Sequence, residues 1–217
     1  DEVEFRQFEM NSKRKVAIVG DSHAKDLLNV VIESGMFDDY EFSSRQINSE
    51  CGNLYLQNYD LLDEFIPERR RVRCDYLGRY EGDKFLQILN EADEIWITAF
   101  WNDWVVEFFP ESIVNLNKDF NKPIRVFGVK SFYPPILRDS LLALPYDQRA
   151  EYTQAVEKNS LDLSSRLNEQ LSEYEYFYPL LDVLCGGESS ECRVFTRNGL
   201  LMSTDGRHLT REGAVEA

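Results

Sequence analysis

The sequence lacks any long hydrophobic run and is poor in cationic residues. No stretch approaches the ~20 apolar residues of a membrane-spanning helix, so we expect no transmembrane segment. Against 39 Asp and Glu stand only 24 Lys and Arg, which gives a formal net charge of −15. This charge opposes non-specific binding to nucleic acid and docking on anionic lipid. Neutral substrates such as sugars and esters meet no such penalty.

Histidine and cysteine are also scarce. Two histidines and no C-x-x-C pair disfavour zinc, and we expect neither a metal nor another cofactor. Four cysteines allow three pairings, of which we favour Cys51–Cys74 and Cys185–Cys192, because each pair lies in an irregular stretch. Disulfides indicate an oxidising compartment. Four unpaired thiols in a cytosolic protein are the alternative.

The length of 217 residues suits one domain that buries a sizeable core. No signal peptide is visible, and the charged opening is what we expect of an excised domain or a processed product. Residues 1–14 are polar with scattered aromatics and predict a lead-in helix or linker. Residues 15–217 predict the domain itself.

The segment after this lead-in predicts a strand, a tight turn and a helix. Val16 to Val19 form an unbroken apolar run, typical of a central parallel strand. Gly20 permits a sharp turn, and apolar residues then recur at helical spacing. Ser22 therefore lies at a helix N-terminus beyond a strand, where open α/β sheets place their sites and where N–H groups favour an oxyanion. A serine that only caps the helix is the alternative.

Further strand-like and helical segments alternate along the chain. The expected strands are 40–47, 94–100, 124–129 and 175–178; the expected helices are 83–92 and 111–120, and a long amphipathic pattern covers 146–174. Residues 48–79 contain a run of arginines and predict an irregular excursion over the active-site face. The alternation implies a mainly parallel five-stranded sheet in a three-layer α/β/α sandwich.

A second candidate motif lies near the end of the chain. Asp205 and His208 are three residues apart before an expected last helix, which Thr210 is placed to cap. An Asp at this spacing can accept the imidazole Nδ1–H while Nε2 points outward. His208 is the better general base for Ser22, because His23 adjoins Ser22 and neighbouring helical side chains do not face each other. The alternative is a surface Asp and His that stabilise a turn.

The two motifs together resemble those of the SGNH (GDSL-like) hydrolase superfamily. They read G-D-S-H over residues 20–23 and D-x-x-H-L-T-x-x-G-A over residues 205–214. With the paired cysteines, they resemble more narrowly the SGNH domains fused to membrane acyltransferase-3 domains, which O-acetylate bacterial surface polysaccharides. The resemblance runs over roughly residues 15–217 and implies an SGNH/flavodoxin-like fold. It implies Ser22 as nucleophile, His208 as base and Asp205 as the residue that orients the base.

The resemblance also implies an oxyanion hole made by the N–H of Ser22, by Gly52 and by Asn102. The sequence around Asn102 departs from the G-x-N-D pattern of the superfamily, because Trp101 precedes it and no glycine does. Trp101 and Trp104 are expected either to form a sugar-stacking wall or to be core residues.

The resemblance implies a serine-dependent O-acetyltransferase that works through an acetyl-serine intermediate. Its partners would be an acetylated donor, a polysaccharide acceptor and a membrane acyltransferase-3 domain in the same or a partner chain, with no nucleic acid. Its place would be periplasmic or extracytoplasmic, tethered to the inner membrane through that domain. A free-standing SGNH carbohydrate acetylesterase and a non-catalytic glycan-binding module are the alternatives.

Overall fold

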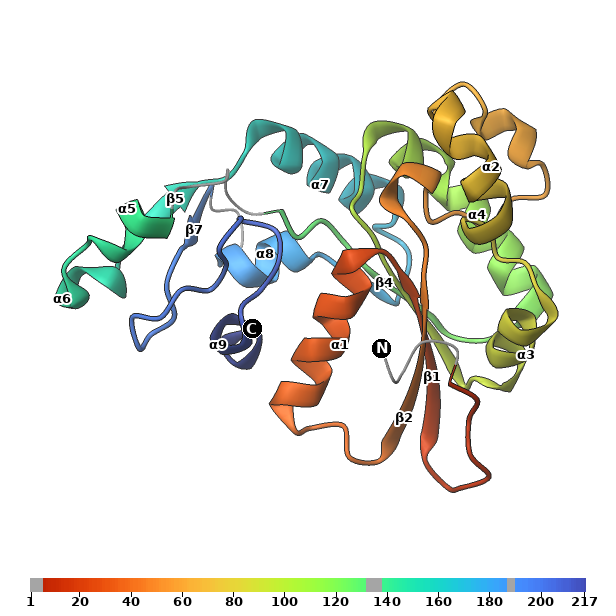
Figure 1. Ribbon diagram of the computed structural model, residues 1–217, viewed down its shortest axis with the longest axis horizontal. Coiled ribbons are helices and arrows are strands. Elements are labelled where there is room, and N and C mark those ends of the chain that lie inside the picture. Colours follow the sequence, from red (N-terminus) through yellow and green to blue (C-terminus); the bar gives the residue numbers. More distant parts are fainter. Residues whose placement is uncertain (1–5, 132–137, 187–189) are drawn as a thin grey trace.

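The computed structural model describes residues 6–131, 138–186 and 190–217. Five parallel strands form the main sheet in the order β2-β1-β3-β4-β6 (Figure 1). They are β1 Arg14–Gly20, β2 Tyr40–Gln46, β3 Glu94–Thr98, β4 Ile124–Phe127 and β6 Phe177–Tyr178. Helices cover both faces, which confirms the expected three-layer α/β/α sandwich with a parallel sheet.

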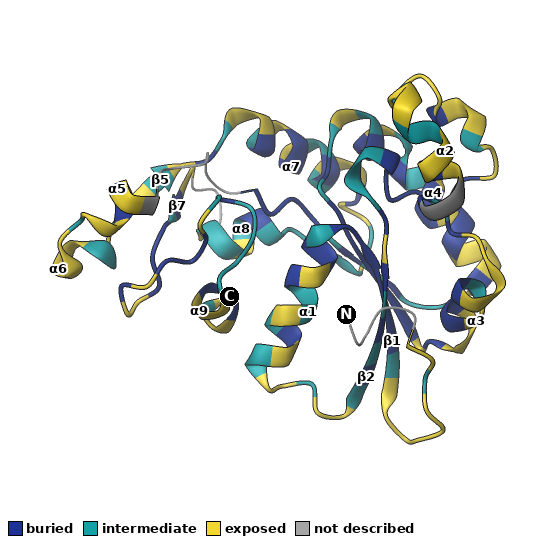
Figure 2. Ribbon diagram, in the orientation of Figure 1, coloured by how far each residue is buried: buried dark blue, intermediate teal, exposed yellow. Residues whose placement is uncertain are grey.

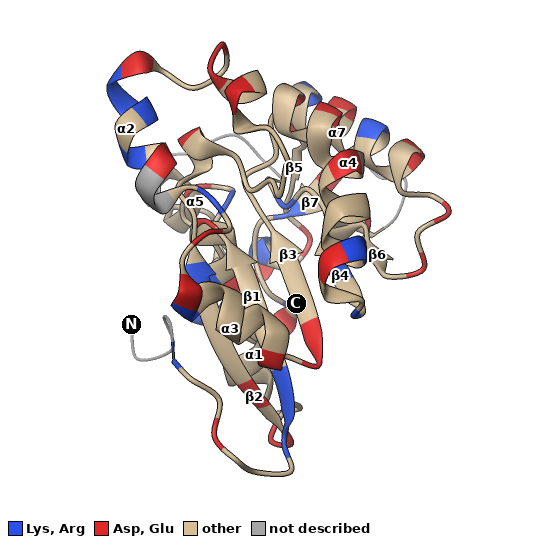
Figure 3. Cartoon of the chain, turned by 90° about the vertical axis from the view of Figure 1, so that its right-hand side faces the viewer, with Lys and Arg blue, Asp and Glu red and all other residues tan. Residues whose placement is uncertain are grey.

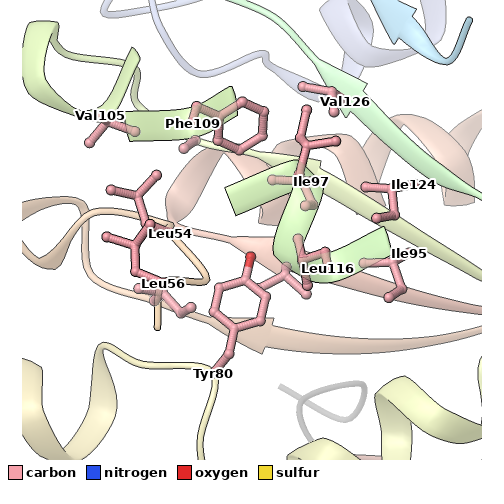
Figure 4. Packing of buried hydrophobic residues seen from close by; sticks show 14 of the residues in the cluster. Leu54, Leu56, Tyr80, Ile95, Ile97, Val105, Phe109, Leu116, Ile124 and Val126 are labelled. Carbon is pink, nitrogen blue, oxygen red and sulfur yellow. The ribbon is translucent and has the colours of Figure 1, made fainter. Parts of the chain in front are cut away.

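The alternation of side chains along β1 explains the two covered faces. Ala17 and Val19 point into the larger core, which α3 (Asp83–Glu91), α4 (Asp103–Phe120) and α7 (Lys158–Gln170) close. Figure 4 shows part of this core. Val16 and Ile18 point to the other face, which α1 (Ser22–Ser34) covers. From Val16 to Val19 the strand is buried on both faces, which explains the unbroken apolar run there (Figure 2).

Three segments differ from the sequence expectations. The excursion after β2 is partly helical, with η1 Ser49–Cys51, η2 Tyr59–Leu62 and α2 Glu68–Leu77, so the arginine run lies on a helix (Figure 3). Helix α4 begins at Asp103 instead of residue 111, because Asn102 caps it and the helix continues through Pro110. The pattern over 146–174 breaks into α6 Tyr146–Arg149, β5 Thr153–Ala155 and α7.

A smaller lobe, with its own core, carries the C-terminal part of the chain. Strand β5 pairs antiparallel with β7 (Glu191–Arg193), and α5 (Arg138–Leu142) and α8 (Leu180–Cys185) pack beside them. The last helix, α9 (Arg211–Glu216), returns to pack against α1 of the main layer. The loop between β7 and α9 therefore lies between the two cores.

Both disulfides join the cysteines in the expected pairs. Cys51 of η1 is bonded to Cys74 of α2, and Cys185 of α8 is bonded to Cys192 of β7. With all four sulfurs bonded, no cysteine is left as a zinc ligand. The first disulfide fixes the arginine-bearing helix to the turn after β2, and the second joins two elements of the smaller lobe.

We expect thiol titration of the denatured, unreduced protein to find almost no free cysteine, because both pairs are bonded. After full reduction the same titration should find the four thiols of the sequence. About two reactive thiols before reduction would show that one disulfide is absent in solution.

The described part of the lead-in, residues 6–13, is irregular and not helical. It packs along β2, where the Glu9 N–H and the Asn11 Nδ2 donate to the Glu41 carboxylate at 2.9 and 3.0 Å. Within the described ranges, no helix combines the length and apolar character that crossing a membrane requires.

Candidate active site

The turn between β1 and α1 is held by a buried carboxylate. Asp21 caps α1, and its Oδ1 accepts the His23 N–H at 2.9 Å. Its Oδ2 accepts the Phe100 N–H at 2.7 Å, which ties this turn to the loop after β3. Burial raises the pKa of Asp21 above its usual 3.8, although both N–H donors oppose the shift. Ser22 is thereby fixed as the first residue of the helix.

Ser22, His208 and Asp205 form a continuous hydrogen-bonded chain. His208 Nε2 lies 2.8 Å from Ser22 Oγ, although the two residues are 186 positions apart in the sequence. His208 Nδ1 lies 2.7 Å from Asp205 Oδ2. An ionised Asp205 accepts the proton on Nδ1, which leaves Nε2 free to accept the Ser22 hydroxyl proton.

Asp205 is held in its ionised form. Burial disfavours the charged carboxylate, but the bonds from the His208 ring and from the backbone N–H groups of His208 and Arg207 outweigh burial. These bonds keep the pKa of Asp205 well below its usual 3.8. The carboxylate oxygen Oδ1 accepts the His208 N–H at 2.8 Å and the Arg207 N–H at 2.9 Å, so the same group shapes the loop and orients the imidazole.

His23 occupies a different place from His208. Only 2% of His23 is exposed, and its ring packs edge-on against the rings of His208 and Phe100, with centroids 5.5 and 5.9 Å apart. Burial, followed by the nearby Lys130 charge, lowers the pKa of His23 well below 6.5. His23 is thus a neutral packing partner of His208.

Asn102 is the N-cap of α4, at the same edge of the sheet as Ser22. Its Oδ1 accepts the Val105 N–H at 3.1 Å, which orients the carboxamide. Among the described residues, none accepts a hydrogen bond from the Asn102 Nδ2. Strands β1 and β3 are parallel neighbours. Ser22 follows the carboxyl end of β1 and Asn102 follows the carboxyl end of β3.

Gly52 ends η1 in the left-handed region, with φ at +68°. The ring of Trp104 lies against it, since a Cβ at this position would be 2.3 Å from Trp104 Cη2. The Gly52 N–H makes a long contact of 3.4 Å to the Ser49 carbonyl. The next residue, Asn53, is buried, and its Nδ2 donates to the Val19 carbonyl at 3.1 Å, which anchors this turn at the carboxyl end of β1.

The two tryptophans have different surroundings. Trp101 is 3% exposed, its Nε1–H donates to the Phe127 carbonyl at 3.1 Å, and its ring packs edge-on against Phe109 at 4.7 Å. Because its surface is already covered, Trp101 is a core residue, and this corrects the expectation of a sugar-stacking wall that includes it. Trp104 is half-buried and stacks on Phe65 with ring centroids 5.6 Å apart.

The structure adds two residues that the sequence reasoning missed. Asp26 of α1 and Lys130 after β4 form a buried ion pair beside the His208 loop. The signal available in the sequence was a carboxylate one helical turn after Ser22, on the same side of the helix. Nothing in the sequence marked Lys130 as its partner.

This fold and site define a hydrolase- or acyltransferase-like α/β domain. The family model of the SGNH domain (fused to AT3 domains) matches residues 4–216, and the chain belongs to this family. A search of curated proteins finds no match to the chain. The two disulfides fit an oxidising, extracytoplasmic compartment.

Proposed function

We propose that this domain is a serine-dependent O-acetyltransferase that moves acetyl groups onto hydroxyls of a bacterial surface polysaccharide. The observation that carries the proposal is the hydrogen-bonded chain from Ser22 Oγ through His208 to Asp205, at 2.8 and 2.7 Å. Membership of a family described as fused to AT3 domains supports acyl transfer with a membrane acyltransferase-3 partner. Residues 15–217 would then be the catalytic domain, tethered to the inner membrane through that partner.

The reaction proceeds in two half-reactions on Ser22. His208 Nε2 takes the Ser22 hydroxyl proton while Oγ attacks the acetyl carbonyl, and a tetrahedral oxyanion forms. Its collapse breaks the ester bond of the donor, and the leaving oxygen receives the proton from Nε2. An acceptor hydroxyl then attacks the acetyl-serine and gives its proton to Nε2, and Ser22 leaves with that proton. Asp205 stabilises the imidazolium in both half-reactions.

Three donors are proposed for the oxyanion. The Ser22 N–H is at the first position of α1, where a backbone N–H has no partner within the helix. Asn102 Nδ2 is the second donor, because its carboxamide oxygen already holds the α4 cap. The Gly52 N–H is the third donor, because its contact to the Ser49 carbonyl is long, at 3.4 Å. Beside these donors, the half-buried Trp104 is the aromatic surface that we propose for the glycan.

Replacing Asn102 by serine should lower kcat by about 10²–10³-fold, because one oxyanion donor is lost. Serine is itself a good N-cap, so the free energy of unfolding should change by less than ~1 kcal/mol. Ester turnover and urea denaturation measure the two effects. Asn102→Asp is the matched control, since it keeps the cap oxygen but has no N–H to donate. Unchanged kcat in Asn102→Ser would remove Asn102 from the oxyanion hole.

The experiment that tests the proposal supplies an activated acetyl ester together with a bacterial surface polysaccharide, and compares wild type with Ser22→Ala. The proposal expects serine-dependent loss of ester with matching gain of acetylated hydroxyls. Acetate without acetylated acceptor would instead indicate an acetylesterase. Glycan binding that Ser22→Ala leaves intact, with no turnover in either protein, would indicate a binding module.

A further inference from the structure

The buried ion pair of Asp26 and Lys130 adjoins the loop that carries His208. Asp26 is 6% exposed and Lys130 is 4% exposed. Lys130 Nζ donates to Asp26 Oδ2. Asp26 is four residues after Ser22 on α1, so the two residues lie on the same side of one rigid helix.

The same carboxylate oxygen also holds the loop that carries the base. Asp26 Oδ2 accepts the Leu209 N–H at 2.9 Å, and Leu209 is the residue next to His208. One carboxylate therefore joins three segments: helix α1, the loop after β4, and the loop before α9. No other hydrogen bond that the described residues provide ties the Leu209 backbone N–H to the main layer.

This contact bridges two separately packed parts of the molecule. Leu209 packs with the core of the smaller lobe, whereas Ser22 begins a helix of the main layer. The β-bridge between Ser203 and Leu209 closes the loop on itself and does not fix its distance from α1. A small shift between the lobes would move His208 Nε2 away from Ser22 Oγ.

We propose that Asp26 and Lys130 are positioning residues, which hold His208 at hydrogen-bond distance from Ser22. Asp26 binds the loop, and Lys130 supplies the opposite charge that its buried carboxylate needs as a partner. A buried carboxylate that loses its partner is strongly destabilising. The kinetic part of this proposal rests on the proposed function, in which Ser22 and His208 carry the chemistry.

The charges around Lys130 are consistent with this role. Lys130 Nζ bonds the Asp26 carboxylate, whereas Asp21 and Asp205 attract the same ammonium group only through space. Burial lowers the pKa of Lys130, and Asp26 opposes that shift. The neutral His23 and Lys130 together line two cavities, one of about 40 Å³ and one of about 70 Å³.

The test separates the hydrogen bond of Asp26 from its charge. Asp26→Ala removes both, Lys130→Met removes the cation, and the double variant Asp26→Asn/Lys130→Met removes both charges but keeps an oxygen for the Leu209 N–H. We expect Asp26→Ala to lower kcat on an activated acetyl ester by about 10–100-fold with KM little changed, since a misplacement of ~1 Å can cost 10²-fold. The double variant should recover to within about fivefold of wild type, because the Leu209 N–H keeps an acceptor and neither member of the Asp26–Lys130 pair is left as a lone buried charge.

A second ion pair, in which the carboxylate is buried, gives the matched control. Glu94 is fully buried at the amino end of β3, the edge opposite the site, and its carboxylate accepts from Arg125 and Trp96. Glu94→Gln should destabilise the fold but leave kcat per folded molecule unchanged. An equal loss of kcat in Glu94→Gln, or kcat within twofold of wild type in folded Asp26→Ala, would overturn the proposal. So would a double variant as impaired as Asp26→Ala.

A measurement without substrate keeps this proposal distinct from the proposed function. Crystal structures of the variants measure the distance between His208 Nε2 and Ser22 Oγ directly, which is 2.8 Å in the wild type. This distance should exceed hydrogen-bond range in Asp26→Ala and stay within it in Glu94→Gln and in the double variant. If wild type turns over no ester, the proposed function fails while this distance still tests the positioning. An unchanged distance in Asp26→Ala would overturn the proposal.

Discussion

Replacing His208 by alanine should lower kcat/KM for an activated acetyl ester by about 10⁴-fold, because general-base catalysis and the orientation of Ser22 are lost together. His208 Nε2 is the ring nitrogen at 2.8 Å from Ser22 Oγ. His23→Asn should keep activity to within about tenfold, since His23 contacts the His208 ring but makes no hydrogen bond to the serine. Initial rates over a range of ester concentrations measure both effects.

Denaturation curves give the control for this pair of variants. The His208 side chain is 39% exposed, so its truncation should change the free energy of unfolding by less than about 1 kcal/mol. His23 is buried, and its replacement should destabilise the fold more than the replacement of His208. A His208→Ala protein that keeps its activity while His23→Asn loses it would mean that the wrong histidine has been named as base.

Replacing Gly20 by alanine should cost at least about 3 kcal/mol of stability, one of the largest effects that a single methyl group can have. A Cβ at this position would lie 1.8 Å from the Thr98 carbonyl oxygen and 3.0 Å from Ala24 Cβ. The first contact is with the backbone of β3, which a change of side-chain rotamer cannot relieve. Strands β1 and β3 would have to separate where the turn to Ser22 begins, and activity should fall as well.

Urea denaturation at constant pH measures this loss, and Gly82→Ala is its control. Gly82 has φ at +96° and open space around its Cβ position, so alanine there meets backbone strain without a clash. That strain is of order 1–3 kcal/mol. The control should nonetheless leave kcat of the folded protein unchanged, because Gly82 precedes α3 away from the site. A Gly20→Ala protein with the stability and activity of wild type would contradict the close packing of β1 on β3.

Much of the fold could be predicted because its signals are local. The apolar run of β1, the turn at Gly20 and the helical spacing after it are written in consecutive residues. The parallel sheet followed from the alternation of strands and helices. Where a boundary depends on a distant contact, the prediction was wrong: the pattern over 146–174 contains β5, whose partner β7 comes 36 or more residues later.

The sequence by itself determined which residues stand at the start of α1 and in the D-x-x-H loop, because spacing within one segment depends only on the local backbone. It also placed the cysteines so that the structure joins them in the expected pairs. Only the tertiary structure decided that Trp101 is a core residue and that Asp26 meets Lys130 and Leu209, at separations of 104 and 183 residues. Such contacts depend on how the two cores pack against each other, and no local pattern records that packing.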